Sequence, residues 1–277
     1  MNDTHQEQTM FSNTMADMSW IEIKQYADEG AVVLLPIGVI EEHGPHLCTA
    51  TDIYAAHIYC LSIKKKLEEK RFSVIIAPPF YWGICQTAKS FIGSFSIKEE
   101  TAYALLFDIL ASLKDFGFDK VFGINGHGDI NHKITIVKAF KDACDQLGIL
   151  ACISYNNFMS EFFGYQKSDP WFYNVIESDI TISKAKTPDV HAGDIETATI
   201  NAFYPDLVNT DKAKSLPDVS LGDNFEAWMF GGKLKQLSPE GYLGSPASYE
   251  SVNITQYLDD YSNRYADAIL TRLNMIK

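Results

Sequence analysis

Two kinds of hydrophobic pattern alternate along the chain. Continuous apolar runs such as AVVLLPI at 31–37, bounded by glycines, are typical of strands buried on both faces. Stretches with apolar residues at helical spacing separate these runs. The patterns predict strands at 31–37, 72–77, 120–124 and 149–155, and helices at 19–26, 51–70, 96–116, 131–147, 194–207 and 254–275. This alternation predicts an α/β fold with a mostly parallel sheet and helices on both of its faces.

The chain is predicted to form one domain behind a polar tail. Residues 1–17 lack an apolar run and are expected to form a flexible tail. Residues 18–277 have the length and composition of a single globular domain. Ser96 and Glu99 have capping-box spacing and are predicted to start the helix 96–116. Residues 156–188 are rich in aromatic side chains and follow neither pattern.

Composition excludes several classes of partner. Lys and Arg number 23 against 36 Asp and Glu in 277 residues, which gives a net charge of −13. Nucleic acid is excluded as a partner, because phosphate binding needs clustered Lys and Arg. No apolar run approaches the roughly 20 residues of a membrane span, and no signal peptide is expected. Five cysteines without a CxxC pair are expected to be free thiols, which indicates a cytoplasmic protein.

Histidines and carboxylates gather in the loops that follow two predicted strands. Glu41 and His43 follow the strand 31–37, and His127 and Asp129 follow the strand 120–124. In parallel sheets these loops meet at one edge and form the ligand crevice. Asp52 stands at the expected first turn of the next helix, where the loop can bring it back toward His43.

These five side chains have the chemistry of a metal site. Two imidazoles and three carboxylates are too many for one closed tetrahedral zinc site, and they suit two ions that share a bridging carboxylate. Zn²⁺ fits such ligands best, with Mn²⁺ or Fe²⁺ as alternatives. A single histidine beside a carboxylate is more often a surface ion pair or a satisfied core residue. The residues by themselves therefore leave both interpretations open.

Three ordered motifs resemble the creatininase (creatinine amidohydrolase) family. Residues 35–47, LPIGVIEEHGPHL, followed by Thr51 and Asp52, resemble its first motif. The second motif is matched by NGHG at 125–128 and the third by HAGDIET at 191–197. The resemblance implies a three-layer α/β/α sandwich that is assembled as a homohexamer and acts as a binuclear metal hydrolase.

The resemblance also implies a role for each motif residue. Glu41, Asp52 and His127 would hold one metal ion, and His43, Asp52 and Asp129 would hold the other, with Asp52 bridging. His191 matches a histidine of the family that is catalytic or contacts the substrate, and Glu196 matches a carboxylate beside it that orients a ligand. Creatinine-cleaving members carry Glu at the position of Asp129, so the ligand arm here is one methylene shorter.

The implied activity is hydrolysis of a non-peptide C–N bond, in a cyclic amide or a formamide of a small molecule, by a metal-activated water. Creatinine itself is not the expected substrate, because Gly128 and Thr187 occupy positions where creatinine-cleaving members have Tyr and Trp. Alternatives on the same scaffold are a ring-opening hydrolase, a peptide-trimming enzyme, or a non-catalytic protein that binds a metal or another ligand.

Overall fold

A four-stranded parallel sheet forms the centre of the molecule. The computed structural model describes residues 8–154, 160–161, 163–224 and 234–275. The strands are β1 (Val32–Ile37), β2 (Val74–Ile76), β3 (Lys120–Asn125) and β4 (Leu150–Ile153). Their order is β2-β1-β3-β4, and all neighbouring pairs are parallel. The predicted α/β fold with a parallel sheet is confirmed.

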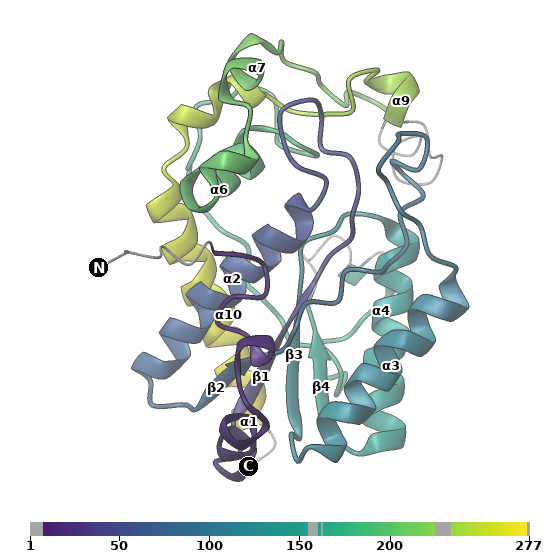
Figure 1. Cartoon of the computed structure of the whole chain (residues 1–277), viewed down its shortest axis with the longest axis vertical. Helices are drawn as coiled ribbons and strands as arrows, with labels where there is room; N and C mark the ends of the chain where they lie inside the picture. The colour runs from purple at the N-terminus through teal and green to yellow at the C-terminus, as the bar shows by residue number, and fades with distance from the viewer. Residues whose placement is uncertain (1–7, 155–159, 162, 225–233, 276–277) are drawn as a thin grey trace.

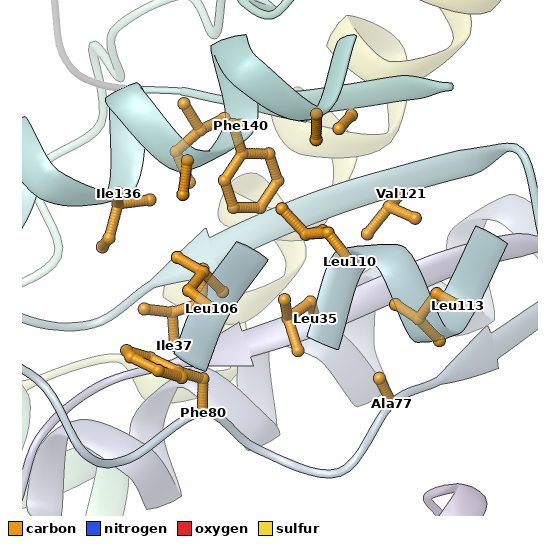
Figure 2. Close-up of a cluster of buried hydrophobic side chains, with 14 of the residues drawn as sticks. Leu35, Ile37, Ala77, Phe80, Leu106, Leu110, Leu113, Val121, Ile136 and Phe140 are labelled. Atoms are coloured by element: carbon orange, nitrogen blue, oxygen red, sulfur yellow. The ribbon is translucent and has the colours of Figure 1, made fainter. Parts of the chain in front are cut away.

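Helices cover both faces of this sheet (Figure 1). On one face lie α2 (Thr51–Glu69) and α10 (Ile254–Asn274), and on the other lie α3 (Glu99–Asp115) and α4 (Ile130–Asp142). Along β1, Val33, Leu35 and Ile37 pack toward α3 and α4, as Figure 2 shows for Leu35 and Ile37. Val32 and Leu34 pack in a separate core with α2 and α10. Side chains of a strand point alternately to its two faces, so one apolar run fills two cores.

The other helices whose bounds the structure describes are short. They are α1 (Trp20–Asp28), α6 (Asp194–Phe203), α7 (Thr210–Ser215) and α9 (Leu234–Leu237), with 3₁₀ turns at Met15–Asp17, Pro205–Leu207 and Pro246–Ser251. Three of them, α6, α7 and α9, lie beyond the carboxyl ends of the strands, at the top of Figure 1. The loops that follow β1 and β3 therefore open toward α6.

Several boundaries differ from the sequence prediction. The strands β2 and β4 are shorter than predicted, and the helix predicted at 194–207 is α-helical only over Asp194–Phe203, with a 3₁₀ turn after it. The capping box at Ser96 is wrong, because α3 begins at Glu99 with Lys98 as its N-cap. The Ser96 hydroxyl instead accepts a hydrogen bond from the backbone N–H of Cys85 at 3.0 Å, and so ties together two parts of the connection between β2 and α3. The helix predicted to continue to Leu147 is α-helical only to Asp142, and a π-helical turn follows.

Part of the segment expected as a flexible tail packs against the domain. Met15 is buried in the core on the α3 and α4 side. The carbonyl oxygen of Ser12 accepts a hydrogen bond from His57 Nε2 at 2.7 Å, which ties this segment to α2. Residues 1–7 lie outside the described residues. No helix among the residues that the structure describes combines the length and the apolar character that crossing a membrane requires.

Candidate metal centre

The loop after β1 brings a carboxylate and an imidazole to the carboxyl end of the sheet. Glu41 and His43 are both buried there, and Asp52 lies in the first turn of α2 beside them. His43 Nε2 lies 3.1 Å from Asp52 Oδ1. The close approach of α2 requires Gly38, because a Cβ at that position would lie 3.0 Å from Asp52 Cβ.

The loop after β3 adds a second imidazole to the same place. His127 Nδ1 lies 3.0 Å from Glu41 Oε1 and 2.9 Å from Asp52 Oδ2. The carboxylate of Asp52 therefore stands between the two histidines, with Oδ1 toward His43 and Oδ2 toward His127. Adjacent parallel strands β1 and β3 place these loops side by side, as the sequence predicted.

His191 and Glu196 reach the centre from the segment that leads into α6. The backbone of His191 pairs with Leu243 in an isolated antiparallel bridge. Asp189 fixes the turn between His191 and Glu196. Its carboxylate accepts hydrogen bonds from the backbone N–H groups of Gly193, Ile195 and Glu196. Burial and the neighbouring charge of Glu196 raise the pKa of Asp189 to about 7. The result is a Glu196 Oε2 atom 3.8 Å from His43 Nε2.

Each of the three histidines has one ring nitrogen fixed by a backbone carbonyl. His43 Nδ1 lies 3.1 Å from the carbonyl oxygen of Glu41, His127 Nε2 lies 3.0 Å from that of Ile84, and His191 Nε2 lies 2.9 Å from that of Glu42. A carbonyl only accepts hydrogen bonds, so each of these nitrogens is the donor. When such a ring is neutral, its other nitrogen presents a lone pair to the carboxylates, as in histidines that bind metals.

The buried carboxylates and imidazoles at the centre can be satisfied by a cation. His127 Nδ1 and Asp52 Oδ2 are buried and 2.9 Å apart, yet neither has a hydrogen-bond partner in the described part of the chain. Burial opposes ionisation of both groups, but the charges of Glu41 and Asp52 raise the pKa of His127, and those of His43 and His127 lower the pKa of Asp52. Two lone pairs facing each other are satisfied by a proton or by a metal ion, so the residues present fit a divalent cation.

Six of the seven residues singled out in the sequence lie together around this point. Three overlapping sets have ligand atoms within 4.8 Å of one another: Glu41 with His43 and His191, Glu41 with Asp52 and His127, and His43 with Asp52 and Glu196. The last two sets share Asp52, whose two oxygens face different histidines. This arrangement can hold two ions bridged by one carboxylate.

Asp129, the seventh residue, is engaged in another way. It is the N-cap of α4, and its Oδ1 accepts hydrogen bonds from the N–H groups of Asn131 and His132. Its Oδ2 accepts from the N–H groups of Gln86 and Thr87 at 2.7 and 3.1 Å. Asp129 is absent from the three sets of ligand atoms found among the described residues, and its role as a ligand stays a prediction.

Two further residues of the centre, Cys85 and Glu42, had no functional role assigned from the sequence. The Cys85 thiol donates a hydrogen bond to Glu41 Oε2 at 2.9 Å, which leaves Oε1 facing His127 and His191. Burial and the charge of Glu41 raise the pKa of this thiol, so it stays protonated. Glu42 supplies the carbonyl that holds His191, and its side chain packs against Gly241, where a Cβ would overlap Oε2. Both contacts join distant segments, so no local sequence signal marks them.

A cavity of about 300 Å³ opens beside these side chains. Glu41, Asp52, His127, His191 and Glu196 all line it. Gly128 lies in its wall and contributes no side chain, in line with the absence of an aromatic residue at this position. The cavity is large enough for a small molecule next to the carboxylate and imidazole cluster.

The chain is similar to known proteins over most of its length. The creatininase family model, described as creatinine amidohydrolase, matches residues 16–269. The chain belongs to the creatininase family. A creatinine amidohydrolase from Pseudomonas putida is 25% identical over 213 residues, which cover 75% of this chain and 78% of that protein. A mycofactocin precursor peptide peptidase from Mycobacterium ulcerans is 25% identical over 249 residues, or 84% of each chain.

Solved creatininase structures share the fold. A crystal structure of creatinine amidohydrolase superposes with a TM-score of 0.65 at 21% identity, over 93% of this chain and 96% of that one. A creatininase structure described as the Mn form gives a TM-score of 0.62 at 22% identity, over 93% and 97% of the two chains. The creatininase fold predicted from the three motifs is confirmed, with helices on both sides of a parallel sheet.

Proposed function

We propose that this creatininase-family protein is a metal-dependent amidohydrolase that uses two divalent ions to cleave a non-peptide C–N bond of a small molecule. The proposal depends on the hydrogen-bonding arrangement that His43, His127 and His191 have in common. Each gives one N–H to a backbone carbonyl and turns its other nitrogen toward carboxylates. Zn²⁺ suits this mixed set of ligands, as do Mn²⁺ and Fe²⁺.

The two ions would occupy the two ligand sets that share Asp52. Glu41, Asp52 and His127 would hold the first ion. His43, Asp52 and Glu196 would hold the second ion, with Glu196 taking the place that the motif comparison gave to Asp129. The hydrogen bonds at Asp129 support this exchange, because both of its oxygens already accept from backbone N–H groups.

The protein's own groups would position and protonate the substrate. When bound, the ions supply Lewis acidity and lower the pKa of a water molecule toward neutrality. His191 Nδ1 faces the cluster 3.9 Å from Glu41 Oε1, while its Nε2 is held by Glu42. Burial and the charge of His43 oppose protonation of His191, but a hydrogen bond with the Glu42 side chain and the charges of Glu41 and Glu42 raise its pKa. His191 is therefore suited to take up a proton and deliver it to the leaving nitrogen.

The exchange of Glu196 for Asp129 predicts opposite results for two variants. Glu196→Gln keeps an acceptor for the N–H of Ala192 but removes the charge, and we expect it to retain one ion per chain instead of two. Asp129→Ala is expected to retain both ions and to lose about 1–3 kcal/mol of stability, because it removes a helix cap and leaves buried donors unpaired. Elemental analysis of the metal-loaded variants measures the number of ions retained. Urea titration of the metal-free variants measures the free energy of unfolding. Loss of an ion from Asp129→Ala alone would restore the assignment made from the motifs.

Creatinine is expected to be a poor substrate. Gly128 leaves that wall of the cavity without a ring, and a ring contact is worth about 1 kcal/mol beyond its buried area. Misplacement at the reacting carbon adds to this loss. Metal-loaded protein incubated with creatinine should therefore form creatine far more slowly than about 10 per second, a typical turnover number. Turnover at that rate would make the protein a plain creatininase.

The amidohydrolase proposal predicts that hydrolysis depends on metal. The purified protein should hydrolyse at least one member of a panel of N-formyl amines and cyclic amides, lose this activity on treatment with a chelator, and regain it with Zn²⁺ or Mn²⁺. The similarity to a peptide peptidase supports one other activity, so short peptides belong in the same panel. Bound metal without hydrolysis of any panel member would favour the non-catalytic alternative.

A further inference from the structure

The carboxylates of Glu41 and Asp52 are held in different ways. Asp52 turns Oδ1 toward His43 and Oδ2 toward His127, so each of its oxygens faces a histidine. Glu41 turns Oε1 toward His127, with 3.0 Å between Oε1 and Nδ1. Its other oxygen, Oε2, lies 2.9 Å from the Sγ atom of Cys85. One oxygen of Glu41 is thus engaged by a thiol, which leaves the other oxygen for an ion.

Cys85 gives a hydrogen bond to this carboxylate. A carboxylate only accepts hydrogen bonds, whereas a thiol can donate one. A thiolate at 2.9 Å would place two negative charges against each other, so the thiol proton lies between Sγ and Oε2. Cys85 and Glu41 are both buried, so bulk water does not compete for this contact. The contact therefore fixes which oxygen of Glu41 faces the imidazole of His127.

Adjacent residues of one segment hold both Glu41 and His127. The carbonyl oxygen of Ile84 accepts the hydrogen bond from His127 Nε2 at 3.0 Å, and the next residue supplies the thiol. The backbone N–H of Cys85 donates to Ser96 Oγ at 3.0 Å, which fixes the segment itself. Glu41 and His127 both belong to the set proposed for the first ion, and neither belongs to the set proposed for the second. The segment therefore acts on one ion of the two.

Loss of the thiol would leave Glu41 Oε2 buried without this donor. A buried charged oxygen that lacks a hydrogen bond is unfavourable. The carboxylate would therefore turn toward another donor, and Oε1 would move away from its place beside His127. Groups that orient a metal ligand in this way typically contribute about 10- to 100-fold to metal affinity.

We propose that Cys85 is a positioning residue for the first ion. Its thiol holds Glu41 Oε2, so that Glu41 binds this ion through Oε1, and the thiol itself is not a ligand. The inference rests on the proposed function, because it concerns one of the two ions of that site. It makes an uncharged side chain outside both ligand sets a determinant of the affinity for one ion and not for the other.

Zinc affinities of matched cysteine variants test this role without an activity assay. Titration of the metal-free protein with Zn²⁺ against a competing chelator gives a dissociation constant for each ion. Cys85→Ala is expected to bind one ion about 10- to 100-fold less tightly and the other as wild type does. Cys85→Ser keeps a hydrogen-bond donor and should restore most of the lost affinity. Cys60→Ala removes a thiol that is equally buried, in the core on the α2 and α10 side, and should bind both ions as wild type does.

The outcomes separate the role of Cys85 from the proposed function. Equal affinities of Cys85→Ala and wild type would overturn the role, as would equal weakening of both ions or a serine variant as weak as the alanine variant. A sulfur-to-metal charge-transfer band in cobalt-loaded wild type that Cys85→Ser lacks would make the thiol a ligand and would overturn it too. Wild type that binds fewer than two ions would instead refute the proposed two-ion site. Cys85→Val, which fills the space without a donor, provides the same comparison should Cys85→Ala not fold.

Discussion

Replacing Asp52 with alanine is expected to remove both ions and to abolish hydrolysis. Asp52 Oδ1 lies 3.1 Å from His43 Nε2, and Asp52 Oδ2 lies 2.9 Å from His127 Nδ1, so one carboxylate would serve both ions. Without it, each ligand set would lose one of its three donors, and the buried histidines would lose the charge that offsets them. We expect activity to fall at least about a thousandfold, or roughly 4 kcal/mol of transition-state stabilisation.

Elemental analysis after desalting, together with the amide assay, measures this effect. Asp28→Ala is the matched control, because Asp28 is an exposed aspartate of α1 that pairs only with Lys24 in the described structure. The control should keep its metal content and activity. Two ions per chain in Asp52→Ala would refute the bridging role and the binuclear assignment with it. Circular dichroism of both variants shows whether lost metal reflects a lost ligand or a lost fold.

Replacing His191 with alanine is expected to slow turnover and leave the metal content intact. His191 would move a proton to the leaving nitrogen, and loss of a positioned acid or base costs about 10²- to 10⁴-fold. The ions would remain, since Glu41, His43, Asp52, His127 and Glu196 still supply both ligand sets. The pH dependence of kcat should also lose the limb that reports protonation of this histidine, a change that a merely structural role would not produce.

Loss of a metal ion from His191→Ala would give this histidine a different role. His191 also belongs to a set of possible ligands with Glu41 and His43. If His191→Ala loses an ion, the histidine is a metal ligand and another group must move the proton. Glu42→Ala, which leaves its backbone carbonyl in place for His191 Nε2, should then retain the ion and serves as the comparison.

The layout of the fold followed from local patterns. Apolar runs over β1 and β3 and the helical spacing between them indicated a parallel sheet, because only a strand buried on both faces lacks polar positions. The ends of elements were harder to predict. Ser96 has the spacing of a capping residue, yet its hydroxyl accepts a hydrogen bond from the backbone N–H of Cys85, earlier in the same connection. A side chain that can cap a helix can equally hold a loop, and only the packed structure selects between them.

The sequence by itself determined the part of the candidate centre that local geometry controls. Glu41, His43 and Asp52 belong to one strand–loop–helix unit, and His127 to the next, so the parallel sheet was sufficient to bring them together. The tertiary structure alone decided the rest. Glu196 reaches His43 because His191 pairs with Leu243 and Asp189 holds the intervening turn, while Asp129 is engaged by Gln86 and Thr87. These contacts join segments far apart in the chain, and their energies depend on burial and packing that no local pattern contains.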